Sequence, residues 1–553
     1  MAAQVAPETT AVSAPPPIVR HFRSIVLWPL QLVPHPGGRT EHWQVLEQQP
    51  APNNWRPVPY GRPGPDPLTG ERHYSEFVSF LPYVQQFMFG DPEQGVSYGA
   101  SPLRAYRRSD IRSARLTFYD DPEPVEFRVA RVELCFFADV DLAILAVEIH
   151  ADNLPMSRVL DTLFRFGRVF PAFWTADGRA GQCLEHVEWL SEDGQVLATS
   201  DFERKERYVS FVAERRASRI SAHWEYLLEP MVSHLSGRPG ALRYRQIEYY
   251  RMPWTAYLAL DDPTALGRPT FARIALGASS GDPATLPFSA RSLENFERDY
   301  CFDRYWAPGE NAPVSNTRYL CSGHGFAMVG AAGDAYFADA NSGLLGQFRH
   351  QYFRLALLSH FHRAALLMLS DRLVVALTRL DIRSVESVKA FKRTIRRTME
   401  TFLRFTHRYW FHEVSTQDQA RVLFRMWATH LGTEQLFSEV REEVHDMNQY
   451  LDSDSLRRQA GTVVRLTVVT ALGLIGTIVT GILGMNIFNY GGVSPLLKLG
   501  IFALALIPSV AVIFFTIARS KGLSDFLEGL SDERLSTRAK VGLFARAWRR
   551  QPR

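Results

Sequence analysis

Cysteine is scarce in this chain, and the few that occur are far apart. The 553 residues include four cysteines, and none of them forms a C-x-x-C pair: Cys135, Cys183, Cys301 and Cys321. A disulfide framework or a structural zinc site needs paired or closely spaced ligands, so this spacing argues against both. The pattern fits a reducing compartment.

Other signals are missing as well. The formal net charge of +4 is small for this length and gives no indication of a nucleic-acid partner. No P-loop occurs, so ATP-driven pumping is not supported. The N-terminus has no basic flank followed by an apolar segment, and we therefore expect no signal peptide.

Charge is absent from one long stretch, since no charged side chain lies between Arg465 and Lys498. Residues 466–486 are apolar or small, and about 20 such residues cross roughly 30 Å of hydrocarbon as a helix. A second apolar run covers 499–518. The pattern predicts a membrane hairpin; a buried hairpin of a soluble protein is the alternative, but such helices rarely lack charge over this length.

Flanking cations indicate the orientation of the predicted hairpin. Arginines precede the first run and basic residues follow the second, whereas the intervening loop carries only Lys498. The positive-inside rule then places both termini in the cytoplasm and the loop outside. We therefore expect a multi-pass protein of the inner or plasma membrane.

The first run closes with Gly484-Met485-Asn486. In this layout, with a large N-terminal part, a long helix, two apolar runs and a short tail, the tripeptide resembles the CorA family of magnesium channels. The resemblance implies a homopentamer in the lipid bilayer that conducts Mg²⁺ inward and needs no cofactor or enzymatic activity. It also implies that Gly484, Met485 and Asn486 form the selectivity filter, with the Asn486 amides binding the hydrated ion.

One face of the first run continues this predicted pore. Its positions step back by three or four residues, as one side of a helix does: Gly481, Thr477, Leu474, Thr470, Leu466 and Val463. Threonine hydroxyls would line the pore, and the leucines would form apolar constrictions. The alternative is that Gly473, Thr477 and Gly481 form a small-residue packing face between helices.

The stretch also departs from the family pattern. Leu483 stands where the family usually has an aromatic residue, and the outer loop lacks an acidic residue and the Met-Pro-Glu motif. An acidic ring would concentrate cations at the mouth. Transport of Zn²⁺, Co²⁺ or Ni²⁺ therefore stays open, as does a membrane-anchored oligomeric sensor or enzyme without flux.

The expected fold class is an α+β membrane protein with an enlarged cytoplasmic α/β domain and a long helical stalk. Alternating apolar residues predict strands at 24–33, 115–119, 125–137 and 143–149, with a bulge in the third. Weaker patterns predict strands at 243–250 and 271–277 and a helix at 219–235. The expected parts are a disordered N-terminus (1–19), the α/β domain (20–341), helices (342–414), a stalk (415–465), the first span (466–488), an outer loop (489–498), the second span (499–518) and a basic tail (519–553).

Helical periodicity dominates after residue 342, and two groups of opposite charge lie on the expected helices. The first group is basic (Lys389, Lys392, Arg393, Arg396 and Arg397), and the second is acidic (Glu434, Glu439, Glu442, Glu443 and Asp446). Antiparallel packing would make them complementary solvated faces. The alternative is that acids bind regulatory Mg²⁺, with Glu439, Glu442, Glu443 and Asp446 as candidates.

The chain also contains a heptad-like spacing and a short motif that resembles a catalytic one. Val440, Val444, Met447 and Leu451 step by four, three and four residues, which predicts a seam for self-association. Residues 277–281 match the G-x-S-x-G of a nucleophile elbow around Ser279, but Asp282-Pro283 predicts a turn where a helix should follow. A catalytic role for Ser279 is therefore not expected.

Overall fold

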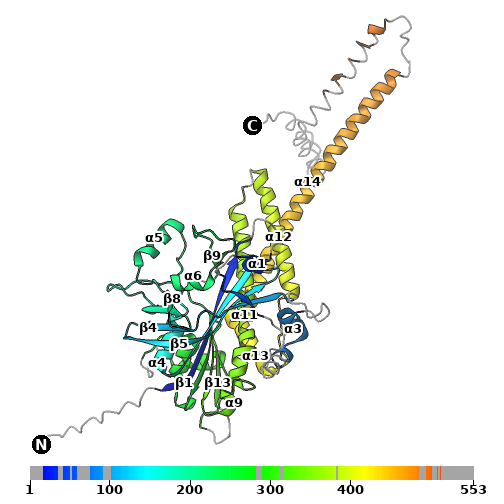
Figure 1. Cartoon of the computed structure of the whole chain (residues 1–553). Coiled ribbons are helices and arrows are strands. Elements are labelled where there is room, and N and C mark those ends of the chain that lie inside the picture. The colour runs from blue at the N-terminus through cyan, green and yellow to red at the C-terminus, as the bar shows by residue number, and fades with distance from the viewer. Residues whose placement is uncertain are drawn as a thin grey trace, which may run out of the picture. The chain divides into compact units, whose positions relative to one another are not determined.

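Three long antiparallel strands form the middle of the sheet: β1 (Ile18–Leu32), β5 (Asp121–Phe137) and β6 (Leu142–Pro155) (Figure 1). This computed structural model describes residues 17–34, 41–49, 53–58, 75–90, 101–247, 250–281, 289–309, 316–381, 384–484 and 494–497, with single positions between 499 and 511. The chain divides into two compact units, Met1–Glu443 and Val444–Arg553. The sheet belongs to the first unit.

The remaining strands extend this sheet on both sides. The path of neighbouring strands runs β12-β13-β14-β11-β1-β6-β5-β4-β7-β8, and β10 also pairs with β1. Pairing is antiparallel except for β11 with β14 and β9 with β10. These strands are β2 (Arg56–Pro57), β3 (Leu103–Arg108), β4 (Ser113–Phe118), β7 (His186–Leu190), β8 (Val196–Thr199), β9 (Val232–Ser233), β10 (Arg243–Gln246), β11 (Trp254–Leu260), β12 (Cys301–Tyr305), β13 (Thr317–Cys321) and β14 (Gly325–Ala331).

The shorter helices mostly alternate with the strands in the sequence, and the four longest follow the last strand. The shorter ones are α1 (His42–Glu47), α3 (Pro82–Phe89), α4 (Met156–Arg165), α5 (Lys205–Arg215), α6 (Ala222–Leu228), α7 (Arg268–Leu276), α8 (Ala290–Tyr300), α9 (Ala335–Ala338) and α10 (Leu344–Gln347), with a 3-10 turn at Pro263–Ala265 and a π turn at Phe348–Tyr352. The longer ones are α11 (Phe353–Thr378), α12 (Val385–Arg408), α13 (Asp418–Leu431) and α14 (Thr433–Gly484).

The two faces of the sheet bury different chemistry because side chains alternate along a strand. Even-numbered residues of β1, such as Phe22 and Trp28, belong to an apolar core that also contains residues of α4, α6 and α7. Trp28 packs edge-on against Trp224 of α6 at 6.1 Å. The odd-numbered residues include Arg23 and Gln31, and this second face lies toward α11.

Several predicted elements are confirmed. The strands predicted in the first 150 residues correspond to β1, β4, β5 and β6, and the bulge appears as a register shift between Val129 and Arg131. The strand predicted at 243–250 is the shorter β10, and the helix predicted at 219–235 is the shorter α6. The prediction of a strand at 271–277 is wrong, because residues 271–276 belong to α7, which has Pro269 in its first turn and Gly277 as its C-cap.

The stalk prediction also needs a correction. The sequence predicts one continuous helical stalk over 415–465. In the structure, Gly432 ends α13 in the left-handed conformation with φ +63°, and α14 begins directly after it. Glycine adopts this conformation without the steric penalty of a Cβ atom, so it allows the chain to stop one helix and start another.

The predictions of a two-span hairpin and a multi-pass membrane location are wrong for the part of the chain that is described. No helix there combines the length and the apolar composition needed to cross a bilayer. Most of the predicted first span lies within α14, and the second apolar run is described only at isolated positions. The fold class is therefore corrected to a mixed α/β structure with one large sheet, and the description of the chain as a membrane transporter is contradicted by the same finding.

Candidate anion-binding site

A groove with three adjoining hollows opens where the end of β1 and the strands β9 and β10 lie near α11 and α12. The polar compartment has a volume of about 660 Å³, and its walls include Gln246, Ile220 and Met368. The basic compartment has about 790 Å³ and includes most of the basic residues of α12. A side compartment of about 320 Å³ lies by Trp43 and Phe137.

Shared walls connect the hollows. The polar and basic compartments have four residues in common: Gln31, His234, Arg245 and Asp371. The basic and side compartments share another four: Pro34, Arg372, Arg397 and Glu400. Volumes of this size are typical of small-molecule sites. The groove is therefore large enough for a ligand that occupies more than one compartment.

Helix α12 presents its basic residues to the groove because it is amphipathic. Phe391 and Ile395 are buried, whereas Arg393, Arg396 and Arg397 are exposed. Ser384 caps the N-terminus by accepting a hydrogen bond from the backbone N–H of Ser387. Residues spaced by three or four positions share one side of a helix, and the arginines consequently face the same hollow.

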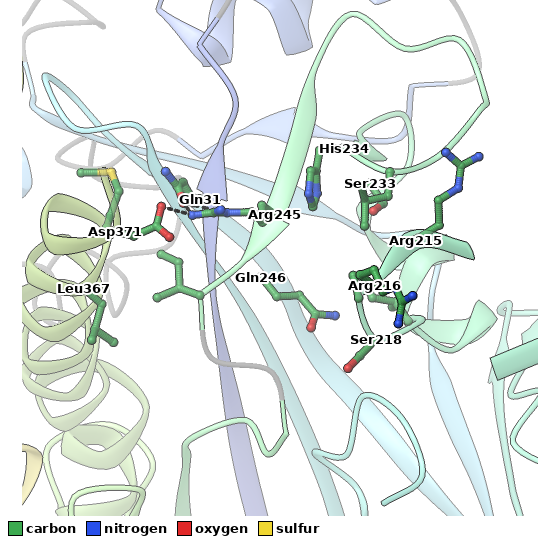
Figure 2. Close-up of a pocket in the computed structure, with 15 residues that line it drawn as sticks. Gln31, Arg215, Arg216, Ser218, Ser233, His234, Arg245, Gln246, Leu367 and Asp371 are labelled. Carbon is green, nitrogen blue, oxygen red and sulfur yellow. Dashed lines mark hydrogen bonds and ion pairs between the residues drawn. The ribbon is translucent and has the colours of Figure 1, made fainter. Parts of the chain in front are cut away.

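Arg245 joins strand and helix at the boundary between the polar and basic compartments (Figure 2). It lies opposite Gln31 in the register of β10 and β1, and its Nε and Nη2 donate hydrogen bonds to Gln31 Oε1 at 3.1 and 2.7 Å. Nη2 also forms an ion pair with Asp371 of α11. Figure 2 shows Arg245 between Asp371 on one side and His234 on the other.

Positive charge exceeds negative charge in the basic compartment. Among the described residues that line it, Asp371 and Glu400 are the only carboxylates, against seven basic side chains: Arg245, Arg372, Arg379, Lys392, Arg393, Arg396 and Arg397. Asp371 is paired with Arg245, and Arg372 is paired with Asp141. Among the described residues, the side chains of Arg379, Arg393, Arg396 and Arg397 have no ion-pair partner. The groove therefore has an uncompensated positive field.

The pKa of His234 reflects these surroundings. Burial favours the neutral imidazole, the nearby charges of Arg245 and Arg243 add to this effect, and together they lower the His234 pKa below its usual value. At Asp141, burial would raise the carboxyl pKa, but the hydrogen bond from His42 and the charge of Arg372 lower it to about 2. Near pH 7, the carboxyl group of Asp141 is therefore ionised and the imidazole of His234 is neutral.

The predicted filter and pore residues belong to the last part of α14 and to the two residues that follow it in sequence, and those that are described do not line the groove. Met485 and Asn486 are outside the described residues, and Gly484 is the last residue of α14. The six predicted pore positions, Gly481, Thr477, Leu474, Thr470, Leu466 and Val463, are exposed on this helix. The Thr470 and Thr477 hydroxyls donate to the helix carbonyls four residues earlier, at 2.8 and 2.9 Å. A Cβ atom at Gly473 or Gly481 would meet no neighbour within 4 Å, so neither position packs closely here.

The acidic candidates do not converge. Glu439 accepts a hydrogen bond from Gln435, and Glu443 accepts one from Ser370 at 3.4 Å. Glu442 is exposed, and Asp446 belongs to the second unit. The described residues contain no group of three or more His, Cys, Asp or Glu that could hold a metal ion. The described residues also contain no ion pair between the acids of α14 in the first unit and the basic residues of α12. Most of those basic residues line the groove instead.

The G-x-S-x-G match has a structural explanation. Gly277 ends α7 in the left-handed conformation with φ +51°, and Ser279 follows it in irregular backbone whose carbonyl accepts from Arg273. A nucleophile elbow joins a strand to a following helix, whereas here the glycine follows a helix. The expectation that Ser279 is not a nucleophile agrees with this placement.

Sequence reasoning noted the basic residues of α12 but did not connect them with β9 and β10. The signal that could have found the groove is Arg245 beside Gln246 at the end of a predicted strand, but their partners are distant in the chain. Gln31 and Arg245 are 214 positions apart, and Arg245 and Asp371 are 126 positions apart. No periodic pattern spans such distances.

Comparisons with known proteins return no matching family model, curated protein or solved structure. The resemblance of the C-terminal stretch, with its oligomer, filter and transported ion, therefore stays a prediction.

Proposed function

We propose that this protein binds a phosphate-bearing anion in the basic compartment and acts as a binding module rather than as an enzyme. The observation that carries the proposal is a set of four arginines, in a hollow of about 790 Å³, that pair with no carboxylate of the described part of the chain. A guanidinium group presents paired N–H donors that match the oxygens of phosphate, and it stays charged at any physiological pH.

Electrostatics favour a ligand with several negative charges. The compartment has seven basic side chains and two carboxylates, and Asp141 pairs with Arg372 from outside it, which leaves an excess of four positive charges (7 − 3 = 4). Like charges held together destabilise a fold unless water, salt or a bound anion offsets them. A ligand with two or three phosphates would offset more of this charge than a monovalent anion.

The solvated face of an ordinary charged helix is the simpler explanation of a basic run. Two features favour a site instead. Lys392, Arg393, Arg396 and Arg397 line a hollow rather than a convex surface, and Arg245 and Arg379 come to the same hollow from other elements. Lys389 belongs to the same run but does not line the hollow, so position rather than composition selects the members.

The test is calorimetric titration of the full chain with inorganic tripolyphosphate at fixed ionic strength. We compare the wild-type protein with the triple variant Arg393→Gln, Arg396→Gln, Arg397→Gln. Each charge-assisted hydrogen bond contributes about 1.5–3 kcal/mol, so loss of one or more predicts at least a tenfold weaker affinity.

The matched control carries the same change of charge at three exposed arginines outside the groove: Arg128→Gln, Arg291→Gln and Arg425→Gln. We expect this control to bind tripolyphosphate as the wild-type protein does. Absence of binding by the folded wild-type protein, or equal loss in both triple variants, would contradict the proposal.

A further inference from the structure

Arginines without a carboxylate partner continue beyond the basic compartment into the polar compartment. Arg215 and Arg216, at the end of α5, line this hollow, and both are exposed. Neither has an ion-pair partner among the described residues. Asp371 is the one carboxylate in the described lining of the polar compartment, and it is paired with Arg245. The polar compartment therefore has an uncompensated positive field as well.

Arg216 occupies a backbone position where glycine is usual. It is the C-cap of α5, in the left-handed conformation with φ +55°, and its backbone N–H donates to the Val212 carbonyl at 3.0 Å. A residue with a Cβ atom is strained in this conformation. A cation in the last turn of a helix offsets the helix dipole, and Arg215 already supplies one. The backbone alone favours glycine at position 216, so the arginine is better explained by a role for its side chain.

Arg245 carries the positive charge from one compartment to the other. It lines both, its side chain is 34% exposed, and Figure 2 shows it between Asp371 on one side and Arg215 and Arg216 on the other. Its Nη1 is accessible and donates no hydrogen bond within the described part of the chain. A series of guanidinium groups thus runs from α5 across β10 to α12.

The side compartment, at the other end of the basic compartment, has a different balance of charge. Its described lining has four carboxylates and three arginines: Glu41, Asp139, Asp141, Glu400, Arg372, Arg397 and Arg404. Arg372 pairs with Asp141, and Arg404 pairs with Asp139 at 2.9 Å. An anion gains little there, because carboxylates already neutralise the arginines. The positive series therefore extends toward α5 rather than toward the side compartment.

We infer that the ligand is a linear inorganic polyphosphate with more than three phosphates, which lies along the basic and polar compartments between α12 and α5. The inference rests on the proposed function and adds the class of ligand. Every unit of such a chain carries a negative charge and oxygen acceptors, so one molecule can meet each arginine of the series.

Single-stranded nucleic acid has a similar repeat of phosphates. Proteins that bind it without regard to sequence combine a basic groove with aromatic side chains on which the bases stack. The described lining of the basic and polar compartments contains no Phe, Tyr or Trp. The groove therefore matches a phosphate chain without bases.

The first test compares chain lengths on the wild-type protein. Tripolyphosphate and longer linear polyphosphates are titrated calorimetrically into the full chain at several salt concentrations. We expect the longer chains to bind about tenfold or more tightly and to lose affinity more steeply with salt, because more of their phosphates are neutralised. A long chain also gains affinity by offering many equivalent positions to a short site, but that gain leaves the salt dependence unchanged. Equal salt dependence for short and long chains would overturn the inference.

The second test removes the two charges of α5 with Arg215→Gln and Arg216→Gln. We expect the affinity for long polyphosphate to fall about tenfold or more, while tripolyphosphate, held by α12, binds nearly as before. The matched control changes two exposed arginines outside the groove, Arg128→Gln and Arg291→Gln, and should alter neither affinity. An unchanged affinity of the double α5 variant for long polyphosphate would contradict the inference.

A further variant separates binding from folding. Arg216→Gly suits the left-handed backbone, so the protein should unfold at the same or a higher urea concentration than the wild-type protein. We expect it nevertheless to bind long polyphosphate more weakly. If this variant is as stable as the wild-type protein and binds long polyphosphate equally well, the Arg216 side chain does not contact the chain and the inference is wrong.

The two levels fail in different ways. If tripolyphosphate binds and longer chains bind no more tightly, the polyphosphate inference is wrong and the proposed anion site stands. If no polyphosphate binds, or if the triple variant of α12 binds long chains as the wild-type protein does, both are wrong. If a single-stranded oligonucleotide with the same number of phosphates binds more tightly than polyphosphate, the ligand is a nucleic acid and the assignment to polyphosphate is wrong.

Discussion

Two clusters of arginine residues in the same unit differ in what neutralises them. On the second face of the sheet, Arg23, Arg131 and Arg349 surround the fully buried carboxylate of Glu148 at 3.0–3.3 Å. Burial would raise the Glu148 pKa, but the three arginines more than offset it and the pKa is lowered. In the basic compartment, no described carboxylate meets Arg393, Arg396 or Arg397.

The difference lies in the position of the counterion. A buried cluster must contain its own counterion, because desolvated charge without a partner costs several kcal/mol. An open cluster can leave its counterion to solvent, where a ligand with the right geometry can replace water and salt. The Glu148 cluster therefore serves the fold, and the basic compartment is available for binding.

The largest expected effect is loss of the internal counterion. Glu148→Gln leaves three arginines around a neutral side chain, and breaking such a buried arrangement costs about 3–5 kcal/mol. We expect urea unfolding to show this loss of the free energy of unfolding at pH 7. Because the folded pKa of Glu148 lies below that of the unfolded chain, its stabilisation is complete above about pH 4.5 and is lost as pH falls through the folded value.

The control for this comparison is an ion pair at the surface. Asp261→Asn breaks the contact with Arg20 at 2.6 Å, where the side chains are 64% and 43% exposed. Solvent screens exposed pairs, so this variant should have nearly the same free energy of unfolding as the wild-type protein. A similar loss in both variants would show that burial does not distinguish the clusters.

The second effect is stabilisation by an external counterion. Tripolyphosphate at 100 times its dissociation constant should stabilise the folded protein by about 2.7 kcal/mol, because it binds the folded state alone. A thermal melt should therefore shift upward in the wild-type protein and much less in the triple variant of Arg393, Arg396 and Arg397. An equal shift with sodium chloride of matched ionic strength would mean that screening, not binding, is responsible.

The third effect concerns pH. His234 is neutral near pH 7 because burial and Arg245 lower its pKa, while Asp371, Arg243, Arg215 and Arg216 are the other charged groups near it. A bound anion favours the protonated imidazole, so binding should take up a proton and become tighter as pH falls, by about threefold to tenfold between pH 8 and 5.5. Calorimetry in two buffers of different ionisation enthalpy measures the proton uptake, and proton release would contradict the expectation.

The smallest effect is on the free protein. Without ligand, the triple variant of Arg393, Arg396 and Arg397 removes repulsion between exposed like charges, so its free energy of unfolding should be unchanged or higher by about 0.5 kcal/mol. Urea unfolding at low salt measures this change. A loss of more than 2 kcal/mol would mean that these arginines support the fold, as the Glu148 cluster does.

Sequence reasoning succeeded where structure follows from local periodicity. The alternation of Val125, Phe127 and Val129 marked β5 and its bulge, and the spacing of Phe391, Ile395 and Phe402 marked α12 and its buried side. It failed where composition allowed two conformations. Residues 271–277 are apolar enough for a strand, but Pro269 at the start and Gly277 at the end delimit a helix.

The distribution of charged residues in the sequence predicted the basic run but not its partners. The basic run of α12 was visible in the sequence, and the acids of α14 were the obvious partners for it. In the structure, most of these basic residues line a groove instead. This is because α12 buries Phe391 and Ile395, so its arginines face β10 and α11. The side on which a helix buries its apolar residues decides what its charged side meets, and that choice depends on the other elements.

The sequence by itself determined most of the strands in the first 150 residues, the buried side of α12, the low cysteine content and the presence of a charge-free stretch after Arg465. These follow from periodicities of two to four residues, which act between neighbours in the chain. Only the tertiary structure decided that Gln31, Arg245 and Asp371 meet, that Glu148 is enclosed by three arginines and that α12 lines a hollow. Most of those contacts join segments more than 100 residues apart, and the packing of the whole sheet with its helices, rather than any local preference, selects them.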